Sequence, residues 1–108
     1  MANMIGFITD IQTADTVIDS IRHAQTSRGQ NYYWTTGAMK IYSGDNAGKM
    51  FIPANDDILN TPLRKGLTPK DFPEYDQLVA LLGGLEARVN INTDVLLDPD
   101  IPTEQPED

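Results

Sequence analysis

The segment that most constrains the fold of this chain is the aromatic stretch at residues 31–53. It holds five of the eight aromatic residues, since the whole sequence has three Phe, four Tyr and one Trp. Four of the five precede Ser43–Lys49, a run rich in Gly, Asp and Asn, and the fifth follows it in a short apolar arm. Strand-forming residues on both sides of such a run are typical of a β-hairpin. The stretch therefore predicts two antiparallel strands, with Gly37 as a bulge in the first.

The first arm of this hairpin has aromatic residues at both odd and even positions, for example Tyr33 and Trp34. Successive side chains of a strand point to opposite faces. Both faces of the hairpin therefore need a cover, and we expect a helix on one face and a second subunit on the other.

Two segments have the periodicity of amphipathic helices. In Thr13–Arg28 the apolar positions repeat at i, i+3, i+4 and i+7, and the first residue is placed to cap the helix. A second helix is predicted from about Asp71 to Leu82, where a Gly pair ends it. Ala54–Gly66 is predicted to be a polar connection that contains one helical turn at Asp56–Asn60.

Two further segments are predicted strands. Ile5–Thr9 is apolar on both faces, and Leu85–Asn92 alternates apolar and polar residues so that one face is dry and the other wet. The predicted order is β-α-β-β-α-β, which makes the chain an α+β protein. A ferredoxin-like split βαβ sandwich is one closure of this order. Another small antiparallel sheet with two helices is the alternative.

Charge divides the 108 residues into a body and a tail. Residues 98–108 hold five of the sixteen acids and no Lys or Arg, so residues 1–97 carry eleven acids against eight bases. We expect residues 1–97 to form a single domain and the Pro-containing tail to be mobile. Because no large Lys/Arg cluster is present, direct binding to nucleic acid is not expected.

Composition also excludes several chemistries. The sequence has no cysteine, which rules out disulfides, thiolate metal sites and thiol catalysis. No apolar stretch approaches the roughly 20 residues of a membrane span, and the N-terminal residues lack the basic region of a secretory signal. The expectation is a soluble, cytoplasmic protein without a cofactor or membrane association.

The run Ser43–Lys49 ends in a Gly-x-x-x-Gly-Lys sequence that superficially resembles a phosphate-binding loop. The full pattern needs Gly where this chain has Ser43 and Ser or Thr where it has Met50, and it must lead into a helix. We therefore interpret the run as a hairpin turn whose glycines supply positive φ angles.

Polar residues suggest two weak candidate sites. Asp19 and His23 are spaced i, i+4 on the first predicted helix, and Asp56 and Asp57 are adjacent on the connection. A surface pair and helix-capping or turn carboxylates explain them better than a catalytic triad or a metal site, since the EF-hand spacing is absent. No catalytic residue and no metal ligand is assigned.

The aromatic residues are the principal candidates for an interface or a pocket. Exposed Trp and Tyr side chains dominate protein interfaces, whereas buried ones build the core through cross-strand pairs. The candidate residues are Tyr32, Tyr33, Trp34, Tyr42, Phe51 and Tyr75.

Three functions fit these observations. The favoured one is a non-enzymatic protein-binding or assembly module that self-associates through the aromatic hairpin, as a homo-oligomer and preferably a dimer, or that binds another protein. Size and composition match the general profile of small accessory proteins of phages or mobile elements, although no motif supports that source. The second is a small-molecule-binding protein or minor enzyme with a pocket between sheet and helices. The third is an inhibitor that mimics acidic ligands through residues 98–108.

Overall fold

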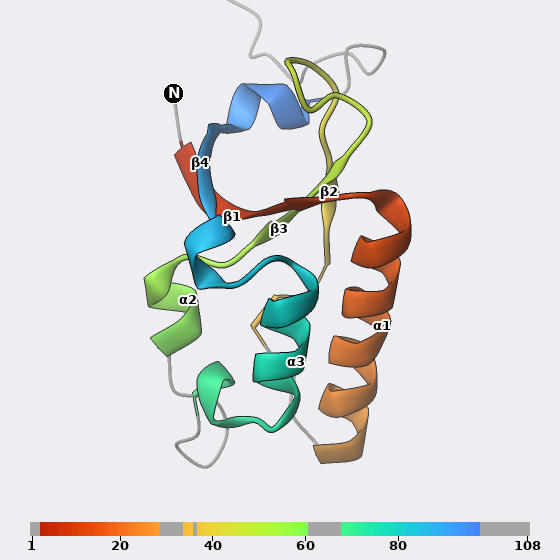
Figure 1. Cartoon of the computed structure of the whole chain (residues 1–108), viewed down its shortest axis with the longest axis vertical. Helices are drawn as coiled ribbons and strands as arrows, with labels where there is room; N and C mark the ends of the chain where they lie inside the picture. The colour runs from red at the N-terminus through yellow and green to blue at the C-terminus, as the bar shows by residue number, and fades with distance from the viewer. Residues whose placement is uncertain (1–2, 29–33, 36, 61–67, 98–108) are drawn as a thin grey trace, which may run out of the picture.

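The computed structural model describes residues 3–28, 34–35, 37–60 and 68–97, which form a small α+β domain (Figure 1). The sheet crosses the upper half of the molecule, and α1 and α3 lie together on one side of it. The described elements are β1 (Asn3–Thr9), α1 (Ile11–Arg28), β2 (Met39–Lys40), β3 (Met50–Pro53), α2 (Asp56–Asn60), η2 (Pro69–Asp71), α3 (Glu74–Leu81), η3 (Leu85–Ala87), β4 (Val89–Asn92) and η4 (Thr93–Leu96). None of these helices is long and apolar enough to cross a membrane.

The sheet has the strand order β2-β3-β1-β4, and each neighbouring pair is antiparallel. Strands β1 and β2, which are connected by α1, are therefore parallel to each other, and β3 lies between them. In the same way, β3 and β4 are parallel to each other, and β1 lies between them. This is the split βαβ arrangement, so the predicted α+β class is confirmed, with α2 and the short 3-10 helices added in the connections.

The main core lies between the helices and one face of the sheet. Phe7 of β1 and Ile52 of β3 are cross-strand partners and are fully buried. Trp34 is only 2% exposed, and its ring packs edge-on against Tyr75 of α3 with centroids 5.9 Å apart. The buried residues of this cluster are Phe7, Ala14, Val17, Ile18, Ile21, Ala24, Trp34, Ile52, Ala54, Leu59, Phe72, Tyr75, Leu78, Val79 and Leu82.

The opposite face of the sheet has a thinner cover. Ile8 pairs with Phe51, and Phe51 pairs with Met39, so these residues alternate with those that face the helices. Gly6 leaves room for β3, because a Cβ there would collide with the Ile52 carbonyl oxygen and would lie 2.8 Å from the Phe51 Cζ atom. Only the loop at residues 41–49 and η4 cover this face among the described residues (Figure 1).

The hairpin exists, but its first strand is much shorter than predicted. Only Met39 and Lys40 pair with β3, and Gly37 precedes the strand, so it is not a bulge within it. The Thr35 hydroxyl donates to the Gly37 carbonyl at 3.0 Å, which makes a local turn in place of ladder pairing. Trp34 lies in the core outside the sheet. Tyr32 and Tyr33 lie outside the described residues.

The predicted strand at 85–92 is wrong in its first half. Residues 85–87 form the 3-10 helix η3, and β4 begins only at Val89. Leu85 and Val89 are 38% and 39% exposed, so the expected dry face does not form there. The reason is the preceding glycine pair: Gly83 and Gly84 have φ angles of 102° and 92°, which turn the chain before the strand can start.

The helix starts also differ from prediction. Helix α1 begins at Ile11, and Asp10 rather than Thr13 caps it: the Thr13 N–H and hydroxyl donate to the Asp10 carboxylate at 2.7 and 3.0 Å. The predicted second helix is divided into η2 and α3, because Phe72, which precedes Pro73, is extended with a ψ angle of 140°. At the start of η2, the Asp71 carboxylate accepts hydrogen bonds from the Thr68 N–H and hydroxyl, both at 2.9 Å. These hydrogen bonds lower the pKa of both carboxyl groups.

Candidate functional site

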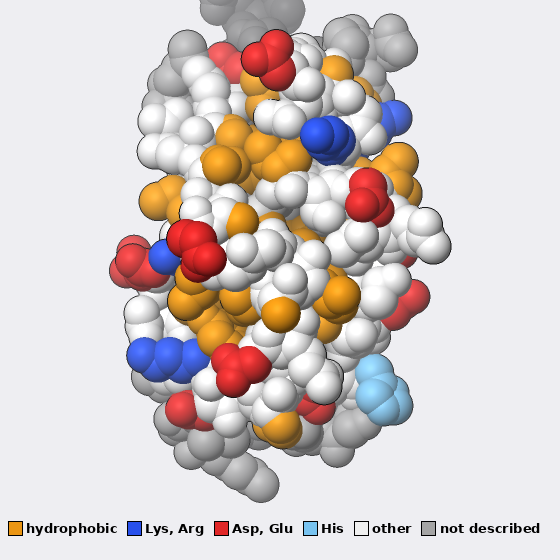
Figure 2. Space-filling view, in the orientation of Figure 1, with side chains coloured by type: hydrophobic (Ala, Val, Ile, Leu, Met, Phe, Trp, Pro, Cys, Tyr) orange, Lys and Arg blue, Asp and Glu red, His pale blue; other side chains and the backbone are white. Residues whose placement is uncertain are grey.

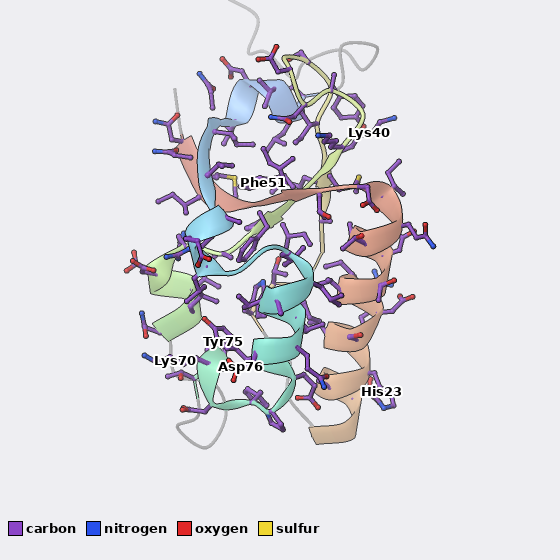
Figure 3. The ribbon with its side chains drawn as sticks, in the orientation of Figure 1. His23, Lys40, Phe51, Lys70, Tyr75 and Asp76 are labelled. Atoms are coloured by element: carbon purple, nitrogen blue, oxygen red, sulfur yellow. The ribbon has the colours of Figure 1, made fainter. Side chains whose placement is uncertain are left out.

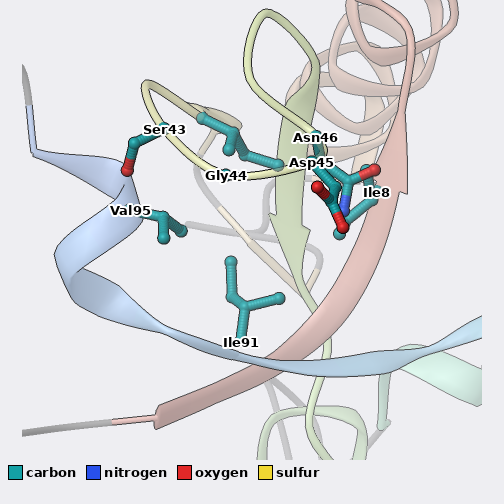
Figure 4. A pocket seen from close by; sticks show the side chains of 8 residues that line it. Ile8, Ser43, Gly44, Asp45, Asn46, Ile91 and Val95 are labelled. Carbon is teal, nitrogen blue, oxygen red and sulfur yellow. The ribbon is translucent and has the colours of Figure 1, made fainter.

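A cavity of about 110 Å³ lies over the sheet face opposite the helices. Its walls come from β1, β4, η4 and the loop at residues 41–49 (Figure 4). In the space-filling view, hydrophobic side chains reach the surface in this upper part of the molecule (Figure 2). The lining is aliphatic at Ile8, Ile41, Ile91 and Val95 and polar at Ser43, Gly44, Asp45 and Asn46.

Backbone hydrogen bonds hold the polar loop in place. The Ile41 N–H donates to the Lys49 carbonyl at 2.9 Å, and the Gly48 N–H donates back to the Ile41 carbonyl at 2.8 Å. Within the loop, the Ala47 N–H donates to the Gly44 carbonyl at 3.2 Å. Gly44 and Gly48 adopt φ angles of 89° and 92°, which explains the glycines at these two positions. The loop is thus a constrained structure, as expected for a hairpin turn.

The second wall is attached to the loop. The Tyr42 N–H donates to the Val95 carbonyl at 2.7 Å, which ties the hairpin to η4. The Asn92 side chain accepts from the Asp94 N–H at 2.9 Å and so caps η4. Two segments about fifty residues apart in sequence therefore close one cavity, with Val95 and Ile91 on one side and the loop on the other.

The polar side of the cavity is acidic. Asp45 is exposed, and its carboxylate makes no ion pair or hydrogen bond within the part of the chain that the structure describes. Figure 4 shows Asp45 and Asn46 close to Ile8, whereas Ser43 lies near Val95 at the other end. Near the same hairpin, the Lys40 ammonium lies 5.4 Å from the centre of the Tyr42 ring, within cation–π distance.

The four predicted aromatic site residues that the structure describes do not gather in one place. Trp34 and Tyr75 belong to the helix-side core. Phe51 is fully buried on the opposite face, and Figure 3 shows it apart from Tyr75. Tyr42 is half-buried at the hairpin and does not line the cavity. Among the described residues, core side chains pack between the sheet and the helices, where a pocket was predicted.

The predicted polar residues are also dispersed. His23 and Asp19 are exposed on α1, and the described ion pair of Asp19 is with Arg22, at 3.7 Å. Figure 3 shows His23 on the outer side of α1, at the end away from Lys40 and Phe51. Asp56 and Asp57 are exposed on α2. Asp19 and His23 thus lie apart from the cavity, as do Asp56 and Asp57.

Asp56 instead takes part in a structural contact that the sequence did not indicate. Arg88 Nη1 donates to Asp56 Oδ1 at 2.7 Å and to the Ala54 carbonyl at 3.1 Å, while its Nε donates to the Leu85 carbonyl at 3.1 Å. Arg88 therefore joins the end of β3 and the start of α2 to η3. Burial raises the pKa of nearby Tyr75, although the Arg88 charge opposes this effect.

The cavity lining offers apolar and polar binding groups. Its lining residues include no histidine and one acid, Asp45, and the described residues show no hydrogen bond between Asp45 and the Ser43 hydroxyl. Within the described residues, no group of three or more His, Asp and Glu could hold a metal ion. The sequence signal for this site was the Gly-rich run at 43–49, but its partner residues Ile91 and Val95 are distant in sequence.

Comparison with known proteins adds no assignment: no family model, no curated protein and no solved structure matches this chain.

Proposed function

We propose that the protein is a non-enzymatic binding and assembly module that self-associates, or binds another protein, through its β-hairpin. The contact surface consists of β2, the loop at residues 41–49 and the adjoining η4. The observation that carries this proposal is the unequal cover of the sheet by the described residues: helices pack one face, while a loop and one 3-10 helix cover the other and leave a cavity.

Two features of this surface favour a protein partner. First, the cavity of about 110 Å³ is well below the roughly 300–1,000 Å³ of pockets for metabolites or cofactors. Its size suits one side chain of a partner. In protein interfaces, hot-spot side chains fill pockets of this kind. Second, Tyr42 is half-buried beside the cavity, where an amphipathic ring can contribute contact area.

Sedimentation equilibrium from low micromolar to near-millimolar protein tests self-association directly. We expect a monomer–dimer equilibrium that tightens with concentration. Tyr42→Ala should weaken the dimer about tenfold in dissociation constant, the effect of losing about 1.4 kcal/mol at an interface.

The matched control is Leu81→Ala on α3. Leu81 is 54% exposed, so it tests whether any exposed hydrophobic residue drives association. Leu81→Ala should leave the equilibrium unchanged. A protein that stays monomeric at every concentration would contradict self-association, and equal effects of the two variants would contradict the hairpin surface.

A further inference from the structure

We propose that the cavity is a receptor for a lysine side chain of a protein partner, with the methylene stem on the aliphatic wall and the ammonium group at Asp45. This inference rests on the proposed function, because it names the group that the binding surface recognises. Three properties of the cavity support it: its volume, the division of its lining and its charge.

The volume fits a stem of four methylenes. A cavity of about 150 Å³ in another protein holds benzene, which has six carbon atoms. In proportion, about 110 Å³ holds four or five non-hydrogen atoms, which is the length of a lysine side chain beyond Cβ. An aromatic side chain or a nucleotide base exceeds this volume.

The division of the lining suits an amphipathic chain. Ile8, Ile41 and Ile91, with Val95, supply an apolar surface for methylenes, which lysine often buries while its charge stays in water. The polar wall carries Asp45 and Asn46 side by side near Ile8 (Figure 4). An ammonium group has three donors and no acceptor, so a carboxylate and an amide oxygen match it.

Charge selects a cation over an anion. Asp45 lines the cavity without a basic partner among the described residues, and no Lys or Arg contributes to the lining. The protein as a whole carries a net charge of −8. Lys40 and Lys49 lie on the same hairpin but do not line the cavity, so Asp45 and the overall net charge favour an ammonium group over a carboxylate or phosphate. Arginine fits less well, because its planar guanidinium is larger than an ammonium group.

The test is an NMR titration of the full ¹⁵N-labelled chain with Nα-acetyl-lysine methylamide. Binding in the millimolar range is expected for so small a probe. The amide signals of Ile8, Asp45, Ile91 and Val95 should shift together. The same probe acetylated at Nε keeps the stem but loses the charge, and sodium chloride at equal ionic strength controls for salt.

Two variants separate the two halves of the site. Asp45→Asn should raise the dissociation constant about two- to fivefold, the range for an exposed ion pair, and Asp76→Asn on α3, which changes net charge equally, should not. Val95→Leu narrows the cavity and should weaken binding of the stem. Equal binding of the Nε-acetylated probe, or no effect of Asp45→Asn, would overturn the role of the ammonium group.

A further probe distinguishes the source of the amine. Butylammonium has the stem without a peptide backbone, so binding of butylammonium but not of the lysine derivative would overturn a protein partner. Absence of binding by both probes would overturn the site. Failure here is distinct from failure of the proposed function. A dimer that binds neither probe retains self-association without a lysine site. A strict monomer that binds lysine loses self-association but retains the binding of another protein.

Discussion

The two faces of the sheet present the same kinds of side chain but are covered in different ways. On the helix face, Phe7 and Ile52 pack against two helices and Trp34 in one large buried cluster. On the other face, Phe51 and Ile41 are just as buried, yet a loop and one 3-10 helix cover them and leave a cavity nearby. Burial alone therefore does not distinguish the faces.

The two faces should also differ in how easily the elements that cover them can change conformation. Helices α1 and α3 are held by many mutual contacts of the core, whereas the loop at 41–49 depends on a few backbone hydrogen bonds and on its link to η4. The face covered by the loop can accept a side chain of a partner at a small free-energy cost, because its packing already leaves a cavity. We therefore expect the helix face to contribute most of the stability, and we propose that the opposite face takes part in recognition.

The largest expected effect is the loss of Trp34. Trp34→Ala removes the ring that packs on Tyr75 in the centre of the helix-side cluster. The free energy of unfolding should fall by about 3–5 kcal/mol, the usual cost of truncating a buried Trp. Urea denaturation followed by circular dichroism measures it. A loss below about 1 kcal/mol would refute the central place of this residue in the core.

A matched pair of isoleucines compares the faces directly. Ile21 on α1 and Ile41 beside the cavity are each 1% exposed. Ile21→Ala should cost about 4 kcal/mol and Ile41→Ala about 2 kcal/mol, within the range for Ile truncation, because a loop collapses more easily than a helix layer. Both values come from the same urea experiment. Equal costs would remove the proposed difference between the faces.

Filling the cavity should have a smaller and opposite effect. Val95→Leu adds one methylene to the cavity wall and should raise the free energy of unfolding by about 0.5–1 kcal/mol. Thermal unfolding is sensitive enough to detect it. Val79→Leu, at a buried position of the helix-side cluster, is the control and should destabilise through overpacking.

The smallest expected effect on stability comes from the cap at the start of α1, and it tests the helix side of the molecule only. Hydrogen bonds from Thr13 lower the pKa of Asp10 in the folded protein, so its contribution to stability is present above the unfolded pKa near 4 and is lost as the pH falls through the folded pKa. Asp10→Asn should remove this part of the acid sensitivity and change little at pH 7, since Asn is also a good cap.

Urea midpoints measured between neutral and acidic pH give this dependence. The control is Asp15→Asn on the same helix, whose carboxylate accepts no hydrogen bond within the described residues. Parallel pH profiles for the wild type and Asp10→Asn would contradict the role of Asp10 as the cap.

Patterns that depend on neighbouring residues were the ones that predicted structure correctly. The stripe of α1 and the hairpin turn at 43–49 were foreseen, because helical periodicity and glycine positions act locally. The strand expected at 85–92 failed for the opposite reason: an alternating pattern is also compatible with a 3-10 turn when glycines redirect the chain before it. Trp34 and Phe51 were recognised as important, but their assignment to opposite faces was not.

The sequence by itself determined the α+β class, the order of elements and the acidic character of the chain, since these follow from local periodicity and composition. Only the tertiary structure decided that Val95 and Ile91 meet the loop at 41–49 and that Arg88 joins Asp56. It also decided that, among the described residues, a large core cluster packs the helix face while a cavity lies on the other face. The physical reason is that these contacts connect residues more than thirty positions apart. Their geometry depends on strand order and register, which no local pattern specifies.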